Sequence, residues 1–176
     1  MSVIKGSQVV EAMGAEIKEQ VEKLNAAGVE PCLAILRVGA DGSQIAYEKG
    51  AKKRMEANGI KYLVTELAED ITQSEFEGEF KKLNEDSKVH GILVLQPLPG
   101  HLSIEPLKNT INPIKDVDAI SPVNLYKVMA GDSTGYAPCT AEGVIEILDW
   151  MKTQYRGKKC AVVGCSLVVG RPLGFL

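Results

Sequence analysis

Apolar and polar positions along the first hundred residues follow two different periods. Helical spacing of apolar residues spans residues 9–27, 43–58 and 72–84, and Gly28 and Gly59 follow the first two segments as typical helix ends. Short runs rich in Val, Ile and Leu lie between them, at residues 31–39, 62–67 and 91–95. Such runs are typical of parallel strands that are buried on both faces. The pattern predicts an α/β fold that begins with an N-terminal, three-layer open sheet domain.

Two loops follow buried strands, where open α/β sheets gather their ligands. The first runs from Val38 and Gly39 into the helix predicted over 43–58, and the second is Gln96-Pro97-Leu98-Pro99-Gly100. Two prolines cannot donate to a sheet ladder, so the second segment is predicted to be a rigid loop. Taken alone, it is better explained as a stiff connector than as a site.

Three later motifs carry candidate chemistry. Residues 112–118 form a polar loop with carboxylates at Asp116 and Asp118, which, taken alone, is more often a solvated turn than a site. At residues 138–143 a proline turn leads into a helix that the Thr140 hydroxyl is expected to cap, and Gly143 is expected to allow a close approach. Residues 159–172 read as a strand, a glycine turn and a helix start, the opening of a dinucleotide-binding Rossmann unit. Because parallel sheets need crossover units of about 30 residues, we expect this second domain to be cut short after its first strand.

Composition excludes several classes of function. The 176 residues carry a net charge of −3, which gives no general attraction for nucleic acid or an anionic membrane, and no apolar run is long enough for a membrane span. The four cysteines show no Cys-x-x-Cys spacing, which indicates reduced thiols in a cytoplasmic protein. With only His90 and His101 available, a metal site is not expected.

In their order, these motifs make the chain resemble the bifunctional methylenetetrahydrofolate dehydrogenase/methenyltetrahydrofolate cyclohydrolase (FolD) family. The resemblance runs from the first helix to Leu176. It rests on the following residues: Val38-Gly39 with Ser43 and Tyr47, Gly91–Val94 with Pro97-Leu98-Pro99, Pro113 with Lys115–Asp118, Pro122 with Asn124, Pro138-Cys139-Thr140, and Val163-Gly164 through Ser166, Val169-Gly170 and Pro172. The resemblance implies that 5,10-methylenetetrahydrofolate is oxidised with NADP or NAD to the methenyl compound, which is then hydrolysed to 10-formyltetrahydrofolate. It also implies a homodimer.

The resemblance assigns roles to individual residues. Tyr47 would stack on the folate, Asp118 would hold the pterin amino group by a charge-assisted hydrogen bond, and Gln96 would tune a catalytic lysine. Leu95 and Pro97 would join Tyr47, Gln96 and Asp118 in the substrate site. The cofactor would contact residues of the helix start and the glycine loop: Thr140, Gly164, Cys165, Ser166, Val169, Gly170 and Arg171.

The chain departs from the family pattern around the catalytic lysine. The family places that lysine four residues after the tyrosine, but Ala51 stands there, and Ser43 lies four residues before Tyr47 instead of three. A family variant favours Lys53, although six residues place it about 120° around the helix from Tyr47, so Lys52 stays an alternative. Leu95 and Gln96 are also exchanged relative to the family order, which we interpret as linked compensation.

Another departure affects the cofactor. Cys165 occupies the position where the family has an arginine for the 2′-phosphate of NADP, so the choice between NADP and NAD stays open. Two alternatives follow from these departures: a cyclohydrolase without dehydrogenase activity, and a non-catalytic folate-binding relative. We expect a folate-binding catalytic domain over residues 1–140. Residues 141–176 are then a linker helix and the first strand and loop of the NAD(P)-binding domain.

Overall fold

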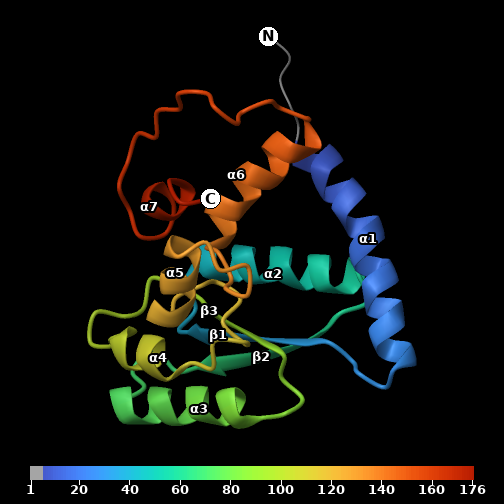
Figure 1. The fold of residues 1–176 in the computed structure, drawn as a ribbon. Helices are drawn as coiled ribbons and strands as arrows, with labels where there is room; N and C mark the ends of the chain where they lie inside the picture. The colour runs from blue at the N-terminus through green and yellow to red at the C-terminus, as the bar shows by residue number, and fades with distance from the viewer. Residues whose placement is uncertain (1–5) are drawn as a thin grey trace.

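The computed structural model describes residues 6–176 and places a three-stranded parallel sheet between helices (Figure 1). Strand β1 (Cys32–Val38) lies in the centre, with β2 (Lys61–Leu67) on one side and β3 (Gly91–Val94) on the other. All three strands come within a residue or two of the predicted runs. The α/β prediction is therefore confirmed.

Helices cover both faces of this sheet (Figure 1). Side chains of successive strand residues point to opposite faces of the sheet. On one face, Ala34, Leu36 and Val38 of β1 join the hydrophobic core that the sheet forms with α3 and α4. On the other face, Arg37 forms a hydrogen bond with Glu48 of α2. The helices are α1 (Gly6–Ala26), α2 (Gly42–Ala57), α3 (Gln73–Glu85), α4 (Glu105–Thr110), α5 (Pro122–Met129), α6 (Cys139–Trp150) and α7 (Gly170–Leu173).

The predicted helix over residues 72–84 has well-defined ends and a buried face. Thr72 caps α3 and exchanges hydrogen bonds with Glu75, so two free backbone donors of the first turn are satisfied. Phe76 and Phe80, four residues apart on one face of the helix, are completely buried against the sheet. This packing fixes the lower layer in Figure 1.

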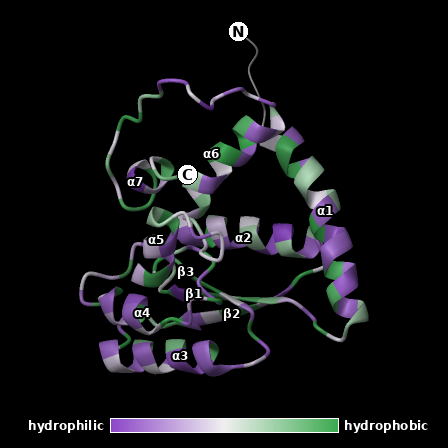
Figure 2. Ribbon diagram, in the orientation of Figure 1, coloured by the Kyte–Doolittle hydropathy of each residue, from purple (hydrophilic) through white to green (hydrophobic). Residues whose placement is uncertain are grey.

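The outer helices are less deeply packed. Only Val9 and Val21 of α1 are buried, and α6 meets this helix near its N-terminal end. Figure 2 shows hydrophobic residues along α6 and near the start of α1, where the two helices meet. Among residues 6–176, no helix has the length and hydropathy that a membrane span requires.

The strand predicted at residues 159–163 does not form. Residues 158–166 have no regular secondary structure and are exposed. A strand needs a neighbour for its N–H and C=O groups, and no described segment lies beside this one as a sheet partner. The predicted helix start does appear, as α7.

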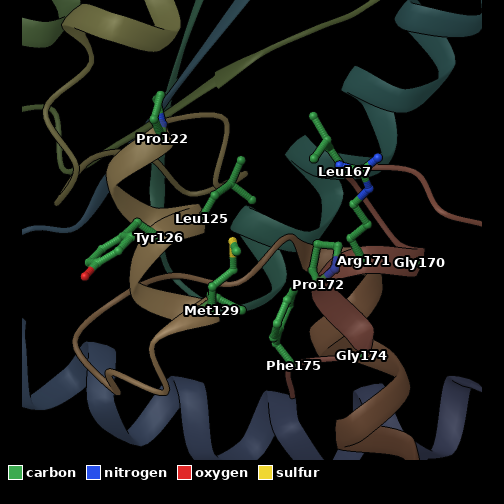
Figure 3. A pocket seen from close by; sticks show the side chains of 11 residues that line it. Pro122, Leu125, Tyr126, Met129, Leu167, Gly170, Arg171, Pro172, Gly174 and Phe175 are labelled. Carbon is green, nitrogen blue, oxygen red and sulfur yellow. The ribbon is translucent and has the colours of Figure 1, made fainter.

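Helix α7 lies against α5 around an apolar cavity of about 630 Å³. Figure 3 shows Leu125 and Met129 of α5 facing Pro172 and Phe175 across it. The residues lining this cavity are almost all apolar. It lacks the converging polar groups that fix the orientation of a substrate.

Three local expectations were wrong or incomplete. Pro138 is the N-cap of α6, and no side chain caps this helix, because Thr140 already lies in its first turn. A Cβ atom on Gly143 would meet nothing within 4 Å, so no close approach requires glycine there. Helices α4 and α5 were not predicted, although the Ser121 cap and the following proline form a recognisable start signal for α5.

Candidate active site

Helix α2 begins at the carboxyl edge of the sheet because Asp41 caps it. After β1 the chain turns at Gly39, whose φ of 74° is one that residues with side chains rarely adopt. Asp41 Oδ1 then accepts hydrogen bonds from the backbone N–H groups of Ser43 (2.9 Å) and Gln44 (3.0 Å). The cap holds the first turn of α2, and with it Tyr47 one turn later, beside the end of β3.

The loop with two carboxylates is fixed against β3. Ile92 N–H donates to the Lys115 carbonyl at 2.7 Å, which extends the sheet by a single parallel bridge. A Cβ atom on Gly91 would lie only 2.6 Å from Val117 Cγ1, so glycine at this position permits the close approach. The loop is therefore held directly against the outer side of β3.

The two carboxylates of this loop have different roles. Asp116 is fully buried and accepts hydrogen bonds from the backbone N–H groups of Ile120 and Ser121 (2.9 Å each) and from Asn124 Nδ2 (3.0 Å). It therefore fixes the turn that leads into α5. The Asp118 carboxylate accepts no hydrogen bond from the described residues and lines a cavity instead.

This cavity has a volume of about 390 Å³ and collects most of the predicted substrate site. Tyr47, Leu95, Gln96 and Asp118 all line it, and so does Thr140, which was predicted to contact the cofactor. Pro97 lines a neighbouring cavity of about 380 Å³. The complete lining of the first cavity is Ser43, Gln44, Tyr47, Leu93, Val94, Leu95, Gln96, Asp118, Thr140 and Val168.

Burial and neighbouring negative charges raise the pKa values of two groups that line this cavity. Burial raises the pKa of Asp118, and the nearby Asp116 carboxylate adds to the increase. Burial and the negative charge of Asp118 also raise the pKa of Tyr47, so its phenol stays neutral near pH 7. Tyr47 as a residue is nevertheless 61% exposed, so its aromatic side chain is accessible for stacking.

Neither candidate lysine lines the cavity. Lys53 is exposed on α2, in agreement with its position about 120° around the helix from Tyr47. Lys52 Nζ lies 2.6 Å from Glu48 Oε1, and this hydrogen bond raises the pKa of the lysine. A general base near neutral pH needs a lowered lysine pKa, so the ion pair argues against Lys52.

Gln44 is the residue that sequence reasoning missed. It is 5% exposed and lies three residues before Tyr47, at the spacing where the family resemblance expects serine. Its Nε2 donates to the Pro97 carbonyl at 2.7 Å. The shifted Ser43 was the available signal, because it left this helix position to a different polar side chain.

The glycine loop before α7 is held by its own hydrogen bonds. Ser166 Oγ accepts from the backbone N–H of Val169 at 3.1 Å and, at 3.4 Å, from that of Gly170, and Arg171 Nε donates to the Cys165 carbonyl at 3.0 Å. A Cβ atom on Gly170 would collide with the Gly164 backbone. Glycine at position 170 therefore allows the loop to close on its own backbone.

Two family models match the chain. Residues 4–118 match the catalytic domain of tetrahydrofolate dehydrogenase/cyclohydrolase, and residues 138–176 match the NAD(P)-binding domain of the same family. The expected division after residue 140 falls within the first turn of α6.

Sequence relatives and solved structures agree with this match. Proteins named bifunctional protein FolD from Alkaliphilus metalliredigens and Clostridium kluyveri are each 46% identical over 174 residues. These alignments cover 99% of this chain and 61% of each relative, so the chain spans about three fifths of their length.

Among solved structures, the FolD methylenetetrahydrofolate dehydrogenase/cyclohydrolase from Campylobacter jejuni superposes with a TM-score of 0.93 at 37% identity, over 97% of this chain and 60% of that one. The enzyme from Trypanosoma brucei, described in complex with NADP cofactor and an inhibitor, gives a TM-score of 0.91 at 30% identity, over 99% of this chain and 60% of that one.

Proposed function

Because the chain belongs to the tetrahydrofolate dehydrogenase/cyclohydrolase family, we propose that it forms the folate-binding side of an enzyme of one-carbon metabolism. The proposed reactions are oxidation of 5,10-methylenetetrahydrofolate with a nicotinamide cofactor and hydrolysis of the methenyl product to 10-formyltetrahydrofolate. The observation that supports this most directly is the cavity that the aromatic ring of Tyr47 and the carboxylate of Asp118 both line.

The chemistry of the cavity suits a reduced pterin. A pterin ring offers a flat face and several N–H groups, so it needs a stacking surface and hydrogen-bond acceptors. The exposed ring of Tyr47 supplies the surface, and Asp118 supplies a carboxylate without a protein partner among the described residues. A ligand that donates to Asp118 would favour its ionised form and offset the increase in its pKa that burial causes.

Catalysis needs a proton donor and acceptor beside the reacting carbon, and Lys53 stays our candidate. Its long side chain starts from an exposed position on α2, whereas Lys52 is tied to Glu48. Gln96 lines the cavity with a side-chain amide that can donate to and accept from such a lysine. In this proposal Lys53 reaches the cavity rim only when the substrate is bound.

The proposed cofactor is NADP or NAD, held by the loop from Gly164 to Arg171 and by Thr140. Bound there, the nicotinamide would accept the hydride. The glycine geometry of the loop fits a nucleotide, and Val168 of this loop lines the same cavity as Tyr47, so loop and folate site adjoin. Cys165 offers no positive charge for a 2′-phosphate, and the Arg171 guanidinium donates to the loop backbone instead. These contacts leave the choice between NADP and NAD to experiment.

We further propose a cytoplasmic homodimer. The four cysteines all lie within residues 6–176 and are free thiols, which supports a reducing compartment. The homodimer rests on the family resemblance alone. Light scattering on a size-exclusion column tests it directly, and a single monomeric peak at micromolar concentration would contradict it.

A non-catalytic folate-binding relative is the second candidate. It is favoured by one specific observation: none of the described residues that line the cavity is a lysine. This alternative predicts folate binding without methenyltetrahydrofolate hydrolysis.

Titration calorimetry with tetrahydrofolate tests the shared part of both candidates. We expect the chain to bind, and we expect Asp118→Asn to weaken binding by about tenfold or more because a charge-assisted hydrogen bond is lost. Asp70→Asn, in an exposed turn, is the matched control and should bind as the unsubstituted chain does. Equal affinities for the two variants would refute the role of Asp118.

Spectrophotometry of methenyltetrahydrofolate hydrolysis then separates the candidates. Binding with hydrolysis that Lys53→Met removes supports the enzyme, whereas binding without hydrolysis supports the non-catalytic relative. Reduction of NADP or NAD in the presence of methylenetetrahydrofolate identifies the cofactor. Hydrolysis without any such reduction would instead indicate a cyclohydrolase alone.

A further inference from the structure

Ala119, which directly follows Asp118, has a backbone conformation that a side chain disfavours. Its φ of 52° lies in the left-handed region, and the residue is only 3% exposed. Residues with a Cβ atom rarely adopt this region, because Cβ then lies too close to the following carbonyl oxygen. Such a conformation persists only where the surrounding structure holds it.

The Asp116 side chain closes the turn that contains Ala119. The backbone of Asp116 is fixed on β3 by its bridge to Ile92. Its Oδ1 accepts a hydrogen bond from the backbone N–H of Ile120, and its Oδ2 accepts one from that of Ser121, each at 2.9 Å. The Ala119 N–H donates to the Asp116 carbonyl at 3.3 Å. One residue therefore holds the chain both before and after Ala119.

Asn124 of α5 holds the Asp116 carboxylate in turn. Its Nδ2 donates to Asp116 Oδ2 and to the Pro113 carbonyl, both at 3.0 Å. Its Oδ1 accepts a hydrogen bond from the backbone N–H of Tyr136 at 3.3 Å. Asp116 and Asn124 are 0% and 1% exposed, so neither offers a surface to a ligand. Any effect of Asp116 on a ligand must pass through the turn.

Asp118 is the residue through which the turn reaches the cavity. It is partly exposed and lines the cavity together with Tyr47. Asp118 lies between Asp116, which is fixed on β3, and Ala119. If Ala119 relaxed to a negative φ, the chain on either side of it would have to rearrange, and Asp118 would move. The place of Asp118 in the cavity therefore depends on the closed turn.

We propose that Asp116 is a positioning residue for ligand binding, which holds Ala119 in the left-handed conformation and so keeps Asp118 in place in the folate cavity. The proposal rests on the proposed folate function and deepens it, because it names the residue that orders the acceptor for the pterin. Asp116 acts from behind the site and touches no ligand.

Asp116→Asn tests the proposal, because asparagine keeps the shape of the side chain but turns an acceptor oxygen into a donor that faces N–H groups. The cost of the left-handed conformation corresponds to about tenfold in an equilibrium. By calorimetry, we therefore expect Asp116→Asn to bind tetrahydrofolate about tenfold more weakly. Phe80→Leu, in the hydrophobic core with α3, is the control, and should lower stability without changing this affinity.

Ala119→Gly separates positioning from a general loss of stability. Glycine adopts a positive φ without a steric penalty, so the turn then needs Asp116 less. In the Ala119→Gly background, Asp116→Asn should therefore weaken binding by no more than about threefold. An equal loss of affinity in both backgrounds would overturn the proposal, because Asp116 would then not act through Ala119.

The possible outcomes also separate this proposal from the folate function. If neither the unsubstituted chain nor Phe80→Leu binds tetrahydrofolate, the folate function fails, and the role of Asp116 fails with it. If both bind and Asp116→Asn binds equally well, only the role of Asp116 is overturned.

One measurement on the unsubstituted chain guards against a variant that does not fold. Backbone coupling constants of Ala119, measured by NMR, should report a positive φ both before and after tetrahydrofolate is added. A negative φ in either state would overturn the proposal, because the turn would then not be held as Asp116 is proposed to hold it.

Discussion

Replacing Glu48 by glutamine should destabilise the fold strongly, although glutamine has almost the same shape. The Glu48 and Arg37 side chains are 6% and 5% exposed, and Arg37 Nε lies 2.7 Å from Glu48 Oε2. Removing one member of a buried ion pair costs about 3–5 kcal/mol, because the other charge stays buried. Arg37 keeps Glu66 as a second partner at 2.8 Å, but that carboxylate is 63% exposed and compensates only in part.

We therefore expect Glu48→Gln to lose about 3 kcal/mol of unfolding free energy, toward the lower end of that range. For a chain of this length, such a loss lowers Tm by about 6–12 °C. Urea denaturation followed by circular dichroism gives the free energy directly, and thermal denaturation gives the shift in Tm. Because the pair joins α2 to β1, the proposed folate cavity should lose affinity for tetrahydrofolate in parallel.

The control is Glu79→Gln, which removes a contact of similar length at the surface. Lys82 Nζ lies 2.6 Å from Glu79 Oε1, but the lysine side chain is 72% exposed, so the expected loss is below about 1 kcal/mol. If both variants lose the same free energy, burial is not what makes the Glu48 pair important, and the reasoning is refuted.

At acid pH, the free energies of unfolding of Glu48→Gln and of the unsubstituted chain should become more similar. Burial raises the pKa of Glu48, but hydrogen bonds from Lys52 and Arg37 outweigh it and hold the pKa below its usual value of 4.5. The pair therefore stabilises the fold fully above that value and loses its contribution as pH falls through the lowered pKa. A difference that stays constant down to strong acid would contradict this account.

Three further predictions concern the site. Gly91→Ala should cost about 1–3 kcal/mol by urea denaturation because its methyl group meets Val117, whereas Gly78→Ala, with open space around it, should not destabilise. Since burial raises the folded pKa of Asp118, the stability of the unsubstituted chain relative to Asp118→Asn should fall as pH rises from the usual value of 3.8 to that raised pKa. The difference between the urea midpoints of the two chains, measured across that range, checks this. Lys52→Met should lower Tm because it breaks the bond to Glu48, and Lys53→Met, on the exposed face, should leave Tm unchanged.

The sheet and its covering helices could be predicted because their signals are local. The apolar run over residues 31–39 predicts a strand, and the helical spacing over residues 72–84 predicts a helix, each from little more than ten neighbouring residues. The strand at 159–163 carried an equally clear local signal and still did not form. A strand depends on a neighbouring strand for its hydrogen bonds, and its own sequence does not show whether that neighbour is present.

The sequence could indicate candidate site residues that lie in a motif of their own, but it could not indicate residues whose role depends on a partner far away in the chain. Tyr47 and Asp118 were placed in one cavity from their motifs. The roles of Asp116 and Gln44 could not be read in the same way. Asp116 owes its structural role to donors that fold back from residues 120–124, and Gln44 owes its role to a carbonyl 53 residues away in the sequence.

The contact between Gly91 and Val117 restrains the position of the neighbouring Asp118. Backbone that is hydrogen-bonded within a sheet opens less often than surface loops do. Gly91 has no Cβ atom, so the loop of Asp118 packs directly against β3. The position of the Asp118 carboxylate is therefore restrained by the sheet. A pterin bound as proposed would therefore be held by a carboxylate on hydrogen-bonded sheet backbone. Misalignment would have to arise on the side of Val168, which lines the same cavity from the turn before α7.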